Sequence, residues 1–396
     1  MAYLGSIAPL TSGVGQAIGD LIALGGIAYL VLALRAVWQW REEHDVSPVI
    51  HPPVTIMVPV CGAPAGLHDC LRSVFRQDYA NLQIVFGLHG PEDPGRIVID
   101  ALRQQFTDID SALVIDETRI GSNPKICNLS NMMPAVKYDI IVMIDSDVKV
   151  DSHFITRATA PMNDRRVGAM TFLYKAEPVG GLVSQLGAMA INDWFIPSAL
   201  VDLSRREMDL CYGAAIVLSR ESLEAVGGLA VLANSLGEDD EIGERLHNAG
   251  YEVRLARQIV TTLVTETDPL EMWRRELRWI RSVRACRPRD HVLSVVMYAL
   301  APVAILVAVF PSVPGLVLLG SMLSLRIWLH LLLRRRTVMP TPVAPWLVPV
   351  RECLSFCLWL ASFSSRRMHW RNSTFDATGG RDMAVCREHR EKVKPG

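Results

Sequence analysis

Residues 139–147 have the sequence DIIVMIDSD, in which an uninterrupted apolar run leads into two aspartates. An apolar run without alternation is typical of a strand that is buried on both faces of a sheet. Asp145 and Asp147 follow at spacing i, i+2, so their carboxylates project to the same side of an extended chain. The stretch therefore predicts a buried strand that delivers two acids to one edge of a sheet.

Strand-like and helix-like segments alternate on either side of this stretch. The strand-like runs are 54–60, 82–88 and 112–117, and the helix-like segments are 66–77 and 96–106. Such alternation predicts an α/β fold with a largely parallel sheet covered by helices on both faces. Ligands of these sheets bind beyond the carboxyl ends of the strands, so we expect the chemistry in the loops that follow strands.

The composition indicates a mixed architecture. Half of the 396 residues are hydrophobic, and the mean hydropathy of +0.23 is high for a soluble protein. Forty Lys and Arg against 41 Asp and Glu leave a formal charge of −1, so no basic field favours nucleic acid as a partner.

Three apolar segments near the ends of the chain, 17–38, 292–310 and 314–333, are long enough to cross a membrane. The turn sequence PSVPG joins the last two into a predicted hairpin. Residues 1–16 contain no Lys or Arg and no cleavage site, so we expect the first helix to be retained. Basic residues follow the first and third spans, and the positive-inside rule then places residues 40–290 in the cytoplasm.

A fourth apolar segment, 346–364, carries Arg351 and Glu352 and precedes a tail with eight Lys and Arg. A full crossing would place this basic tail outside, so we expect a re-entrant or interfacial helix. The expected organisation is a transmembrane helix (1–40), a cytoplasmic catalytic domain (50–288), a transmembrane hairpin (290–334), the re-entrant or interfacial helix (345–365) and a basic cytoplasmic tail (366–396).

Asp145 and Asp147 are candidate metal ligands. Two carboxylates placed in this way can hold Mg²⁺ or Mn²⁺, and the metal can hold a diphosphate. A lone Asp-x-Asp is also common in solvated turns, and the two interpretations have equal weight on this motif alone.

Residues 119–129, RIGSNPKICNL, predict a helix N-terminus beside Lys125. Ser122 or Asn123 can cap the helix and Pro124 suits its first position, so backbone N–H groups and a lysine face any anion bound there. An ordinary capped helix with a surface lysine explains the pattern equally well.

The stretch SLGEDDEIGERL at 235–246 places three acids at a helix start. Its apolar face is predicted to bury Ile242, Leu246 and Ala249, which puts Glu238 and Asp239 each roughly 50° from the centre of that face and Asp240 on the solvated side. Carboxylates at a helix start are also favoured by the helix dipole alone. Periodicity removes Asp240 as a candidate base but does not choose between the other two.

Residues 271–284, EMWRRELRWIRSVR, place Arg275 and Arg278 one helical turn apart, with Trp279 adjoining them. Bidentate arginines suit a departing pyrophosphate. A basic, tryptophan-bearing membrane anchor is the alternative.

Taken together, VPV at the first strand, LRSVFRQDYANLQIV, the Asp-x-Asp, the acidic pair and RELRW resemble the family-2 inverting glycosyltransferases. The chain is more narrowly similar to the ceramide glucosyltransferases (family-21 type) and their bacterial relatives that glycosylate hopanoids. That similarity rests on GSNPKICNL, KYDIIVMIDSDVKV, TFLYKAEPVGG, CYGAAIVLSRESLEAVGGL, GEDDEIGERL, RELRW and MHWRNSTFDATGGRDM. It covers about residues 50–385.

The resemblance implies a GT-A type catalytic domain and a role for each candidate residue. Asp145 and Asp147 would hold the metal and the nucleotide diphosphate, and Lys125 would lie beside it. Asp239 would be the general base, with Glu238 as its partner. Arg275, Arg278 and Trp279 would form the (Q/R)xxRW motif of the family.

One departure from the family pattern concerns the end of the second strand. Family-2 enzymes place there an aspartate that contacts uracil, whereas this chain has Leu88 and His89. The ceramide branch carries its acid slightly later, before a proline, which points to Asp93.

The resemblance further implies UDP-glucose or UDP-N-acetylglucosamine as donor and a membrane lipid as acceptor, either a ceramide or a hopanoid polyol. It also implies an integral protein of the bacterial inner membrane. The segment 186–201, with Trp194 and Phe195, is a candidate lipid entrance, with core packing as the equal alternative. A processive polysaccharide synthase and a non-catalytic, lipid-binding relative of these enzymes are the rival functions.

Overall fold

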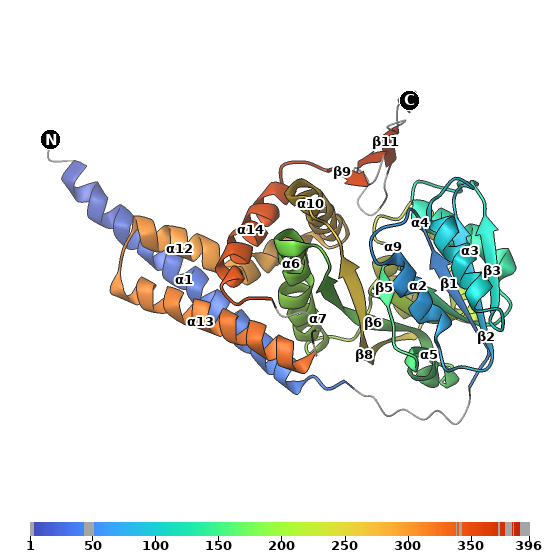
Figure 1. Cartoon of the computed structure of the whole chain (residues 1–396). Coiled ribbons are helices and arrows are strands. Elements are labelled where there is room, and N and C mark those ends of the chain that lie inside the picture. Colours follow the sequence, from blue (N-terminus) through green and yellow to red (C-terminus); the bar gives the residue numbers. More distant parts are fainter. Residues whose placement is uncertain are drawn as a thin grey trace.

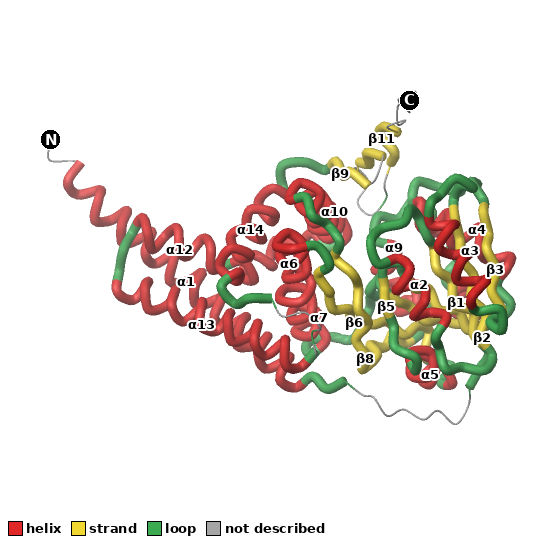
Figure 2. The backbone as a smooth tube through the Cα atoms, viewed as in Figure 1, coloured by secondary structure: helices red, strands yellow, loops and turns green. Residues whose placement is uncertain are grey.

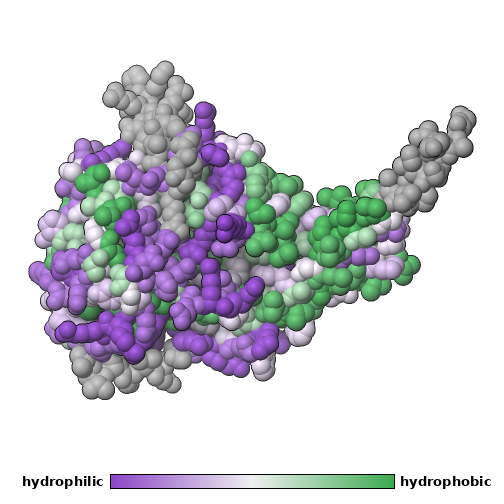
Figure 3. Space-filling model, turned by 180° about the vertical axis from the view of Figure 1, so that it is seen from behind, coloured by the Kyte–Doolittle hydropathy of each residue, from purple (hydrophilic) through white to green (hydrophobic). Residues whose placement is uncertain are grey.

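The computed structural model describes residues 4–42, 51–337, 339, 343–370, 373–376, 382 and 384–388. A long helical arm projects from a domain built on a sheet, and a cluster of shorter helices lies between the two (Figures 1 and 2). The arm consists of α1 (Leu4–Gln39), α12 (Leu300–Val309) and α13 (Val313–Arg336). Figure 3 shows that apolar side chains gather on the arm, whereas polar side chains cover the sheet domain.

The sheet has eight strands in the order β3-β2-β1-β4-β7-β6-β8-β5. Its parallel half is formed by β1 (Val54–Pro59), β2 (Leu82–Leu88), β3 (Asp110–Ile115) and β4 (Ile140–Ile144). The other half contains β5 (Val148–Lys149), β6 (Val167–Pro178), β7 (Ala215–Ser219) and β8 (Glu252–Val264). The α/β fold predicted from the sequence is confirmed, and the stretch 139–147 forms the central strand β4 and the turn after it.

The sheet is mixed rather than largely parallel, because β7 runs antiparallel to both β4 and β6. The chain leaves β6, passes through the helices beside the arm and re-enters the sheet in the opposite direction. The turn after β4 thereby meets the start of β7, where the backbone N–H of Asp145 donates to the carbonyl of Ala214 at 3.1 Å.

Helices cover both faces of the sheet, as expected. On one face α2 (Leu67–Phe75), α3 (Gly95–Gln105) and α5 (Phe154–Thr159) pack on the apolar side chains of the parallel strands. On the other face lie α4 (Pro124–Met132), α8 (Arg220–Ala225) and α9 (Glu238–Asn248). Completely buried side chains such as Ile56 on one face and Met57 on the other alternate along β1, which fixes the register of the two cores.

Five helical segments lie between the arm and the sheet. They are α6 (Gly181–Met189), the π-helix Ala190–Phe195, α7 (Ile196–Leu203), α10 (Pro269–Cys286) and α14 (Leu347–Ser362). One apolar cluster joins α1, α7, α12 and α13 to residues of β6 and β8. The arm is therefore joined to β6 and β8 of the sheet by a continuous core.

Two helices, Gly13–Gln39 and Val313–Arg336, are long and apolar enough to cross a membrane. The predicted span 292–310 is not one straight helix, because its two halves, Pro288–Tyr298 and Leu300–Val309, meet at a bend of 55°. Pro302 explains the break, since proline lacks an N–H and its ring collides with the carbonyl of residue 298 in a continuous helix.

Within the fourth apolar segment, α14 buries both of its charged residues. Arg351 donates to both carboxylate oxygens of Glu276 on α10, at 2.9 and 2.5 Å, and Glu352 accepts from Arg326 on α13 at 2.5 Å. Each of these four side chains is at most 3% exposed. Each of these buried charges is therefore paired with an opposite charge of the protein, and the re-entrant or interfacial placement of the segment remains a prediction.

A small sheet formed by β9 (Arg367–Trp370), β10 (Ser373–Asp376) and β11 (Ala384–Glu388) follows α14. Arg284 of α10 donates to the carbonyl of Ser365 at 2.8 Å, which holds this part of the chain beside the catalytic side. Five of the eight basic residues of the predicted tail lie outside the described residues: Arg371, Arg381, Arg390, Lys392 and Lys394.

Candidate active site

Two of the candidate acids lie in the turn that connects β4 to β5. Asp145 is half-buried, whereas Asp147 is open to solvent in a pocket. Enclosure by the pocket walls and the negative charge of Asp145 raise the pKa of Asp147 to about 6. The turn after β4 therefore carries two carboxylates whose negative charges repel each other. A cation bound between them would reduce this repulsion.

Lys125 is the cation that meets these acids in the structure. Asn123 accepts from the backbone N–H groups of Lys125 and Ile126 and so caps α4, as the sequence predicts for Ser122 or Asn123. The Lys125 ammonium lies 2.7 Å from Asp145 and 3.3 Å from Glu238. It also donates to the carbonyl of Gly213 at 3.3 Å. Lys125 thus joins the turn after β4 to the start of α9.

Glu238 is held from two directions. The side-chain amide of Asn123 donates to one carboxylate oxygen at 3.1 Å, and Lys125 lies against the other. Only 13% of the Glu238 side chain is exposed. A carboxylate that is already paired and hydrogen-bonded suits a structural or electrostatic role better than proton removal.

Asp239 is half-buried beside Gly213, at the start of β7. A Cβ on Gly213 would lie 2.9 Å from an Asp239 carboxylate oxygen, so a larger residue there would displace this carboxylate. Burial and the charge of Glu238 raise the pKa of Asp239 to about 7, although the Lys125 ammonium acts in the opposite direction. A base near neutral pH needs such a pKa.

Two details of the predicted α9 were wrong. Asp240 is not solvated: its side chain is 16% exposed and accepts from Arg287 at 2.7 Å, because the end of α10 reaches the start of α9. Ala249 is exposed, because α9 ends at Asn248 and the chain turns at Gly250, whose φ is 85°. Ile242 and Leu246 are each 1% exposed, as predicted.

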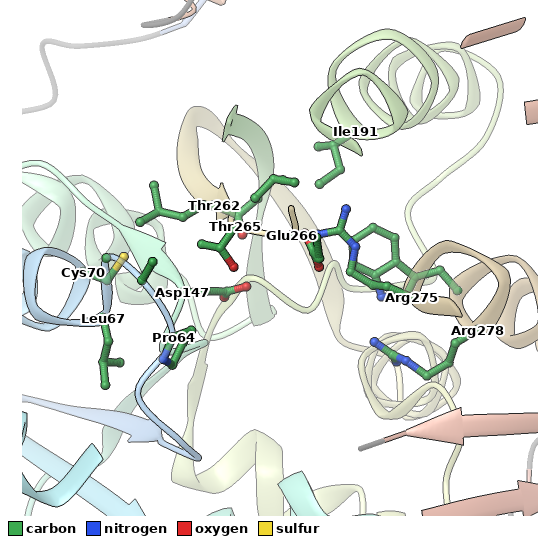
Figure 4. Close-up of a pocket in the computed structure, with 15 residues that line it drawn as sticks. Pro64, Leu67, Cys70, Asp147, Ile191, Thr262, Thr265, Glu266, Arg275 and Arg278 are labelled. Carbon is green, nitrogen blue, oxygen red and sulfur yellow. The ribbon is translucent and has the colours of Figure 1, made fainter. Parts of the chain in front are cut away.

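A pocket of about 190 Å³ opens between the loop before α2, the ends of β4 and β8, and α10. Figure 4 shows Asp147 between the loop that carries Pro64 and the helix that carries Arg275 and Arg278. Within this pocket Arg275 pairs with Glu266 at 2.6 Å and lies 4.9 Å from the ring centroid of Trp279. Its Nε and Nη2 atoms are buried and have no hydrogen-bond partner within the protein, which is costly for a charged group.

Arg278 lines the same pocket one turn further along α10. Burial and the neighbouring Arg275 lower the pKa of Arg278 to about 10, while Glu238 and Asp145 raise it. The guanidinium is charged at neutral pH and lies where the acids of β4 and α9 attract it. The structure therefore brings Arg275, Arg278 and Trp279 together with the acids, as the sequence predicts.

Asp93 has a different environment from the other candidates. Its carboxylate accepts from the backbone N–H of Gly62 at 2.9 Å and from that of Gly95 at 2.8 Å, which ties the loop after β1 to the start of α3. His89, at the end of β2, has Nε2 2.8 Å from the carbonyl of Pro124. Both residues lie in the loop between β2 and α3. Each contacts the backbone of another loop at this edge of the sheet.

Several residues at the site carry no signal in the chain's local pattern. Glu266 is an exception, because it directly follows β8 and the expectation that chemistry follows strand ends could have found it. Thr262 and Gly213 matter only because strands distant in the sequence meet there. Tyr174 of β6 is a further neighbour: burial and the charge of Asp239 raise the pKa of its hydroxyl.

The segment 186–201 is only partly what the sequence predicts. Trp194 is 5% exposed and lies under the guanidinium of Arg326, 3.7 Å from the ring centroid, so it belongs to the core and not to an entrance. Phe195 is half-buried and faces Tyr174.

The donor set of Asp145 and Asp147 fits a hard divalent cation. Both offer carboxylate oxygens, Asp147 opens into the pocket, and burial raises the pKa of both acids, with the charge of Asp145 adding to the shift at Asp147. No group of three or more His, Cys, Asp or Glu able to hold a metal occurs among the described residues. The chain would therefore supply two ligands, and a bound diphosphate or water the rest.

Comparisons with known proteins give one family. The family model described as "Glycosyl transferase family 21" matches residues 19–383. "Ceramide glucosyltransferase 3" of Caenorhabditis elegans is 24% identical over 289 residues, which is 69% of this chain and 61% of that protein. A "Ceramide glucosyltransferase" of Komagataella phaffii is 32% identical over 127 residues, or 31% of this chain and 25% of the relative. The chain thus spans less than two thirds of the length of these relatives.

Among solved structures, the chain is similar to a mannosyltransferase of Pyrobaculum calidifontis in complex with GDP-Man and Mn²⁺. The TM-score is 0.54 at 18% identity, and the match covers 87% of this chain and 99% of the other. At this identity the likeness concerns the fold alone.

Proposed function

This chain belongs to glycosyl transferase family 21 and has a GT-A type fold, and from this premise we propose that it moves a hexose from a UDP-sugar to the hydroxyl of a membrane lipid. Glucose and a ceramide are the first candidates, because relatives with these names match the chain. N-acetylglucosamine and a hopanoid polyol are the alternatives within the same chemistry.

One observation carries the proposal: an acid suited to a metal and two arginines line one pocket, and an ion-pair network links the neighbouring Asp145 to the helix start that carries the candidate base. Asp147 and Arg278 both line the pocket, and Lys125 connects Asp145 to the start of α9, where Asp239 lies. Transfer from a nucleotide sugar needs these parts, since the leaving group is a diphosphate and the attacking group is a weakly acidic hydroxyl.

On the donor side, the nucleotide diphosphate would lie against Asp147 and the guanidinium groups of Arg275 and Arg278. A Mg²⁺ or Mn²⁺ on Asp145 and Asp147 would neutralise the charge of the diphosphate as it leaves. The unpartnered Nε and Nη2 donors of Arg275 would bind phosphate oxygens, and Trp279 fixes the arginine against its face.

On the acceptor side, Asp239 would take the proton of the lipid hydroxyl as its oxygen attacks the anomeric carbon from the face opposite UDP. This displacement inverts the anomeric centre. Glu238 stays bound to Asn123 and Lys125 and contributes the negative charge that keeps the proton affinity of Asp239 high.

The arm explains how a lipid would be met. Two apolar helices suited to a membrane are joined to the catalytic side by one core, so a lipid alcohol at the bilayer surface can reach the site without leaving the membrane. We propose that the protein is an integral membrane protein with residues 40–290 in the cytoplasm of a bacterial cell, as the flanking arginines predict.

Purified protein in detergent with phospholipid, incubated with UDP-[¹⁴C]glucose or UDP-N-[¹⁴C]acetylglucosamine, tests the proposal. We expect either the ceramide or the hopanoid polyol to gain a single sugar, in a reaction that depends on Mg²⁺ or Mn²⁺. Polymeric product would instead identify a processive synthase. Absence of transfer from either donor to either lipid would reject the proposed function and favour the non-catalytic alternative.

A further inference from the structure

The π-helix Ala190–Phe195 is fixed by a different partner at each of its central residues. Ile191 lines the pocket, and Asn192 makes two hydrogen bonds with the backbone of Ala176, at 2.8 and 2.9 Å. Asp193 lies 2.9 Å from the His330 ring nitrogen, and Trp194 lies under Arg326. π-Helical turns are rare and occur frequently at functional sites. Phe195, the last residue of this π-helix, directly follows these positions.

Phe195 is the centre of a strip of three aromatic rings. Tyr174 of β6 stacks on it with ring centroids 4.4 Å apart, and Tyr212 meets it edge-on at 5.1 Å. All three side chains are half-buried, so each keeps part of its surface exposed. Aromatic rings with an open side present apolar surface to a ligand.

One end of the aromatic strip reaches the candidate base. Tyr212 immediately precedes Gly213, the residue whose missing Cβ leaves room for the Asp239 carboxylate. The backbone N–H of Cys211, on the other side of Tyr212, donates to the Asp239 carbonyl at 3.3 Å. Tyr174 also feels the charge of Asp239, which contributes to the raised pKa of its hydroxyl.

The aromatic strip also contacts the core of the membrane helices. Phe195 and Tyr212 pack against the apolar cluster that contains Leu30, Val37 and Leu329 of the arm. Phe195 also packs, with Tyr174 and Trp279, against the cluster at the pocket wall that contains Ile191 and Val264. Phe195 is therefore a bridge between the core of the membrane arm and the wall of the catalytic pocket.

From this continuity we propose that Tyr174, Phe195 and Tyr212 form the acceptor subsite, in which the hydrocarbon next to the reacting hydroxyl of a lipid alcohol lies along the aromatic strip and directs that hydroxyl to Asp239. The inference rests on the proposed function and assigns residues to its lipid substrate. A soluble sugar acceptor would also stack on aromatic rings. Continuity with the arm favours the lipid, because a sugar gains nothing from an apolar path into the bilayer.

The first test is kinetic. Phe195→Leu keeps an apolar side chain but removes the ring, so we expect KM for the lipid alcohol to rise on the order of tenfold, while KM for UDP-glucose and the slow hydrolysis of UDP-glucose by water change less than about twofold. Phe195→Tyr keeps the ring and is expected to restore the wild-type KM. Phe356→Leu is the matched control, because Phe356 is a half-buried ring stacked on Trp359 of α14, away from the aromatic strip.

The second test requires no turnover. Full-length protein in phospholipid vesicles is irradiated with a long-chain alcohol that carries a diazirine three carbons from its hydroxyl, and the labelled residues are located by mass spectrometry. We expect label on Tyr174, Phe195 or Tyr212, and less of it in Phe195→Leu than in Phe356→Leu.

The two tests separate failure of the inference from failure of the proposed function. Hexose transfer to lipid with label confined to the outer faces of α1 and α13 would overturn the subsite and leave the function standing. Label on the aromatic strip without transfer to any lipid would retain the subsite and reject the function. An equal rise in KM for a soluble oligosaccharide acceptor in Phe195→Leu would also overturn the inference, because the aromatic strip would then bind sugars and not a lipid.

Discussion

At Asp239, partial burial and three neighbouring charges act on one carboxyl group. Burial, Glu238 and Asp240 raise its pKa, and Lys125 lowers it, with a result of about 7. Glu238 and Asp240 have protein partners of their own, Asn123 for the first and Arg287 for the second. Three adjacent acids therefore have three different environments. Among them only Asp239 combines a neighbour without a side chain, Gly213, with a pKa suited to a base.

The pH dependence of transfer follows from this environment. A base works in its ionised form, so kcat/KM for the lipid should rise as pH increases through about 7 and level off above it. Lys125→Met removes a cation that lowers the pKa of Asp239, so the acid limb should move to higher pH. Measuring kcat/KM against pH for the wild type and for Lys125→Met, at saturating donor, checks this prediction. An acid limb at the same pH in both proteins would contradict it.

Helical phase was sufficient to place Ile242 and Leu246 in the core, because that pattern depends on residues of one helix. It could not place Asp240, because its partner Arg287 lies 47 residues away at the end of α10. The choice between Glu238 and Asp239 also depends on distant groups, Asn123 and Lys125. Local periodicity identifies candidates at this site, and contacts between strands and helices determine their roles.

At the scale of elements, α10 separates the catalytic pocket from the membrane-side helices. Arg275, Arg278 and Trp279 line the pocket, whereas Glu276 turns the other way and binds Arg351 of α14. The sequence predicted α10 and α14 as separate helices. That a charged residue of α10 pairs with a charged residue of α14 could not be predicted without the fold. The bend before α12 follows from Pro302, a signal that is present in the sequence.

Breaking the Glu276–Arg351 pair should destabilise the protein and disturb the pocket. Both side chains are at most 3% exposed, so Glu276→Gln leaves a buried guanidinium without its counter-charge, at a cost of about 3–5 kcal/mol. We expect a lower Tm in detergent and a higher KM for UDP-glucose. The exposed pair Asp202–Arg206 offers the control, because Asp202→Asn should cost less than about 1 kcal/mol. Equal effects of the two substitutions would contradict this account of α10.

At the scale of the whole molecule, the catalytic domain and the chain after α14 lie on the same side of the arm. Arg281 donates to the carbonyl of Arg367 at 2.6 Å, and Asp382 forms an isolated strand pairing with Ser235, three residues before Glu238. The hairpin between α12 and α13 lies at the far end of the arm (Figure 1). We propose from this arrangement that the chain after α14 lies on the same side of the membrane as the catalytic domain, without a fourth crossing.

Labelling with a membrane-impermeant maleimide tests this topology. In a protein whose native cysteines are replaced by serine, Val313→Cys marks the hairpin, where the side chain is 75% exposed, and Asp382→Cys marks the chain after α14. We expect position 313 to be labelled in intact spheroplasts and position 382 only after permeabilisation. Labelling of position 382 from outside would require α14 to cross the membrane.

The most direct measurement of the central claim compares Asp239→Asn with Asp240→Asn in transfer and in UDP-glucose binding. We expect Asp239→Asn to lose transfer by about 10²–10⁴-fold and to bind UDP-glucose with an unchanged Kd, because it removes only the base. Asp240→Asn should retain most of the activity. Since the raised pKa means that ionised Asp239 disfavours the folded state above about pH 7, Asp239→Asn should be no less stable than wild type at pH 8. Appreciable turnover in a folded Asp239→Asn protein would contradict the assignment of Asp239 as the base.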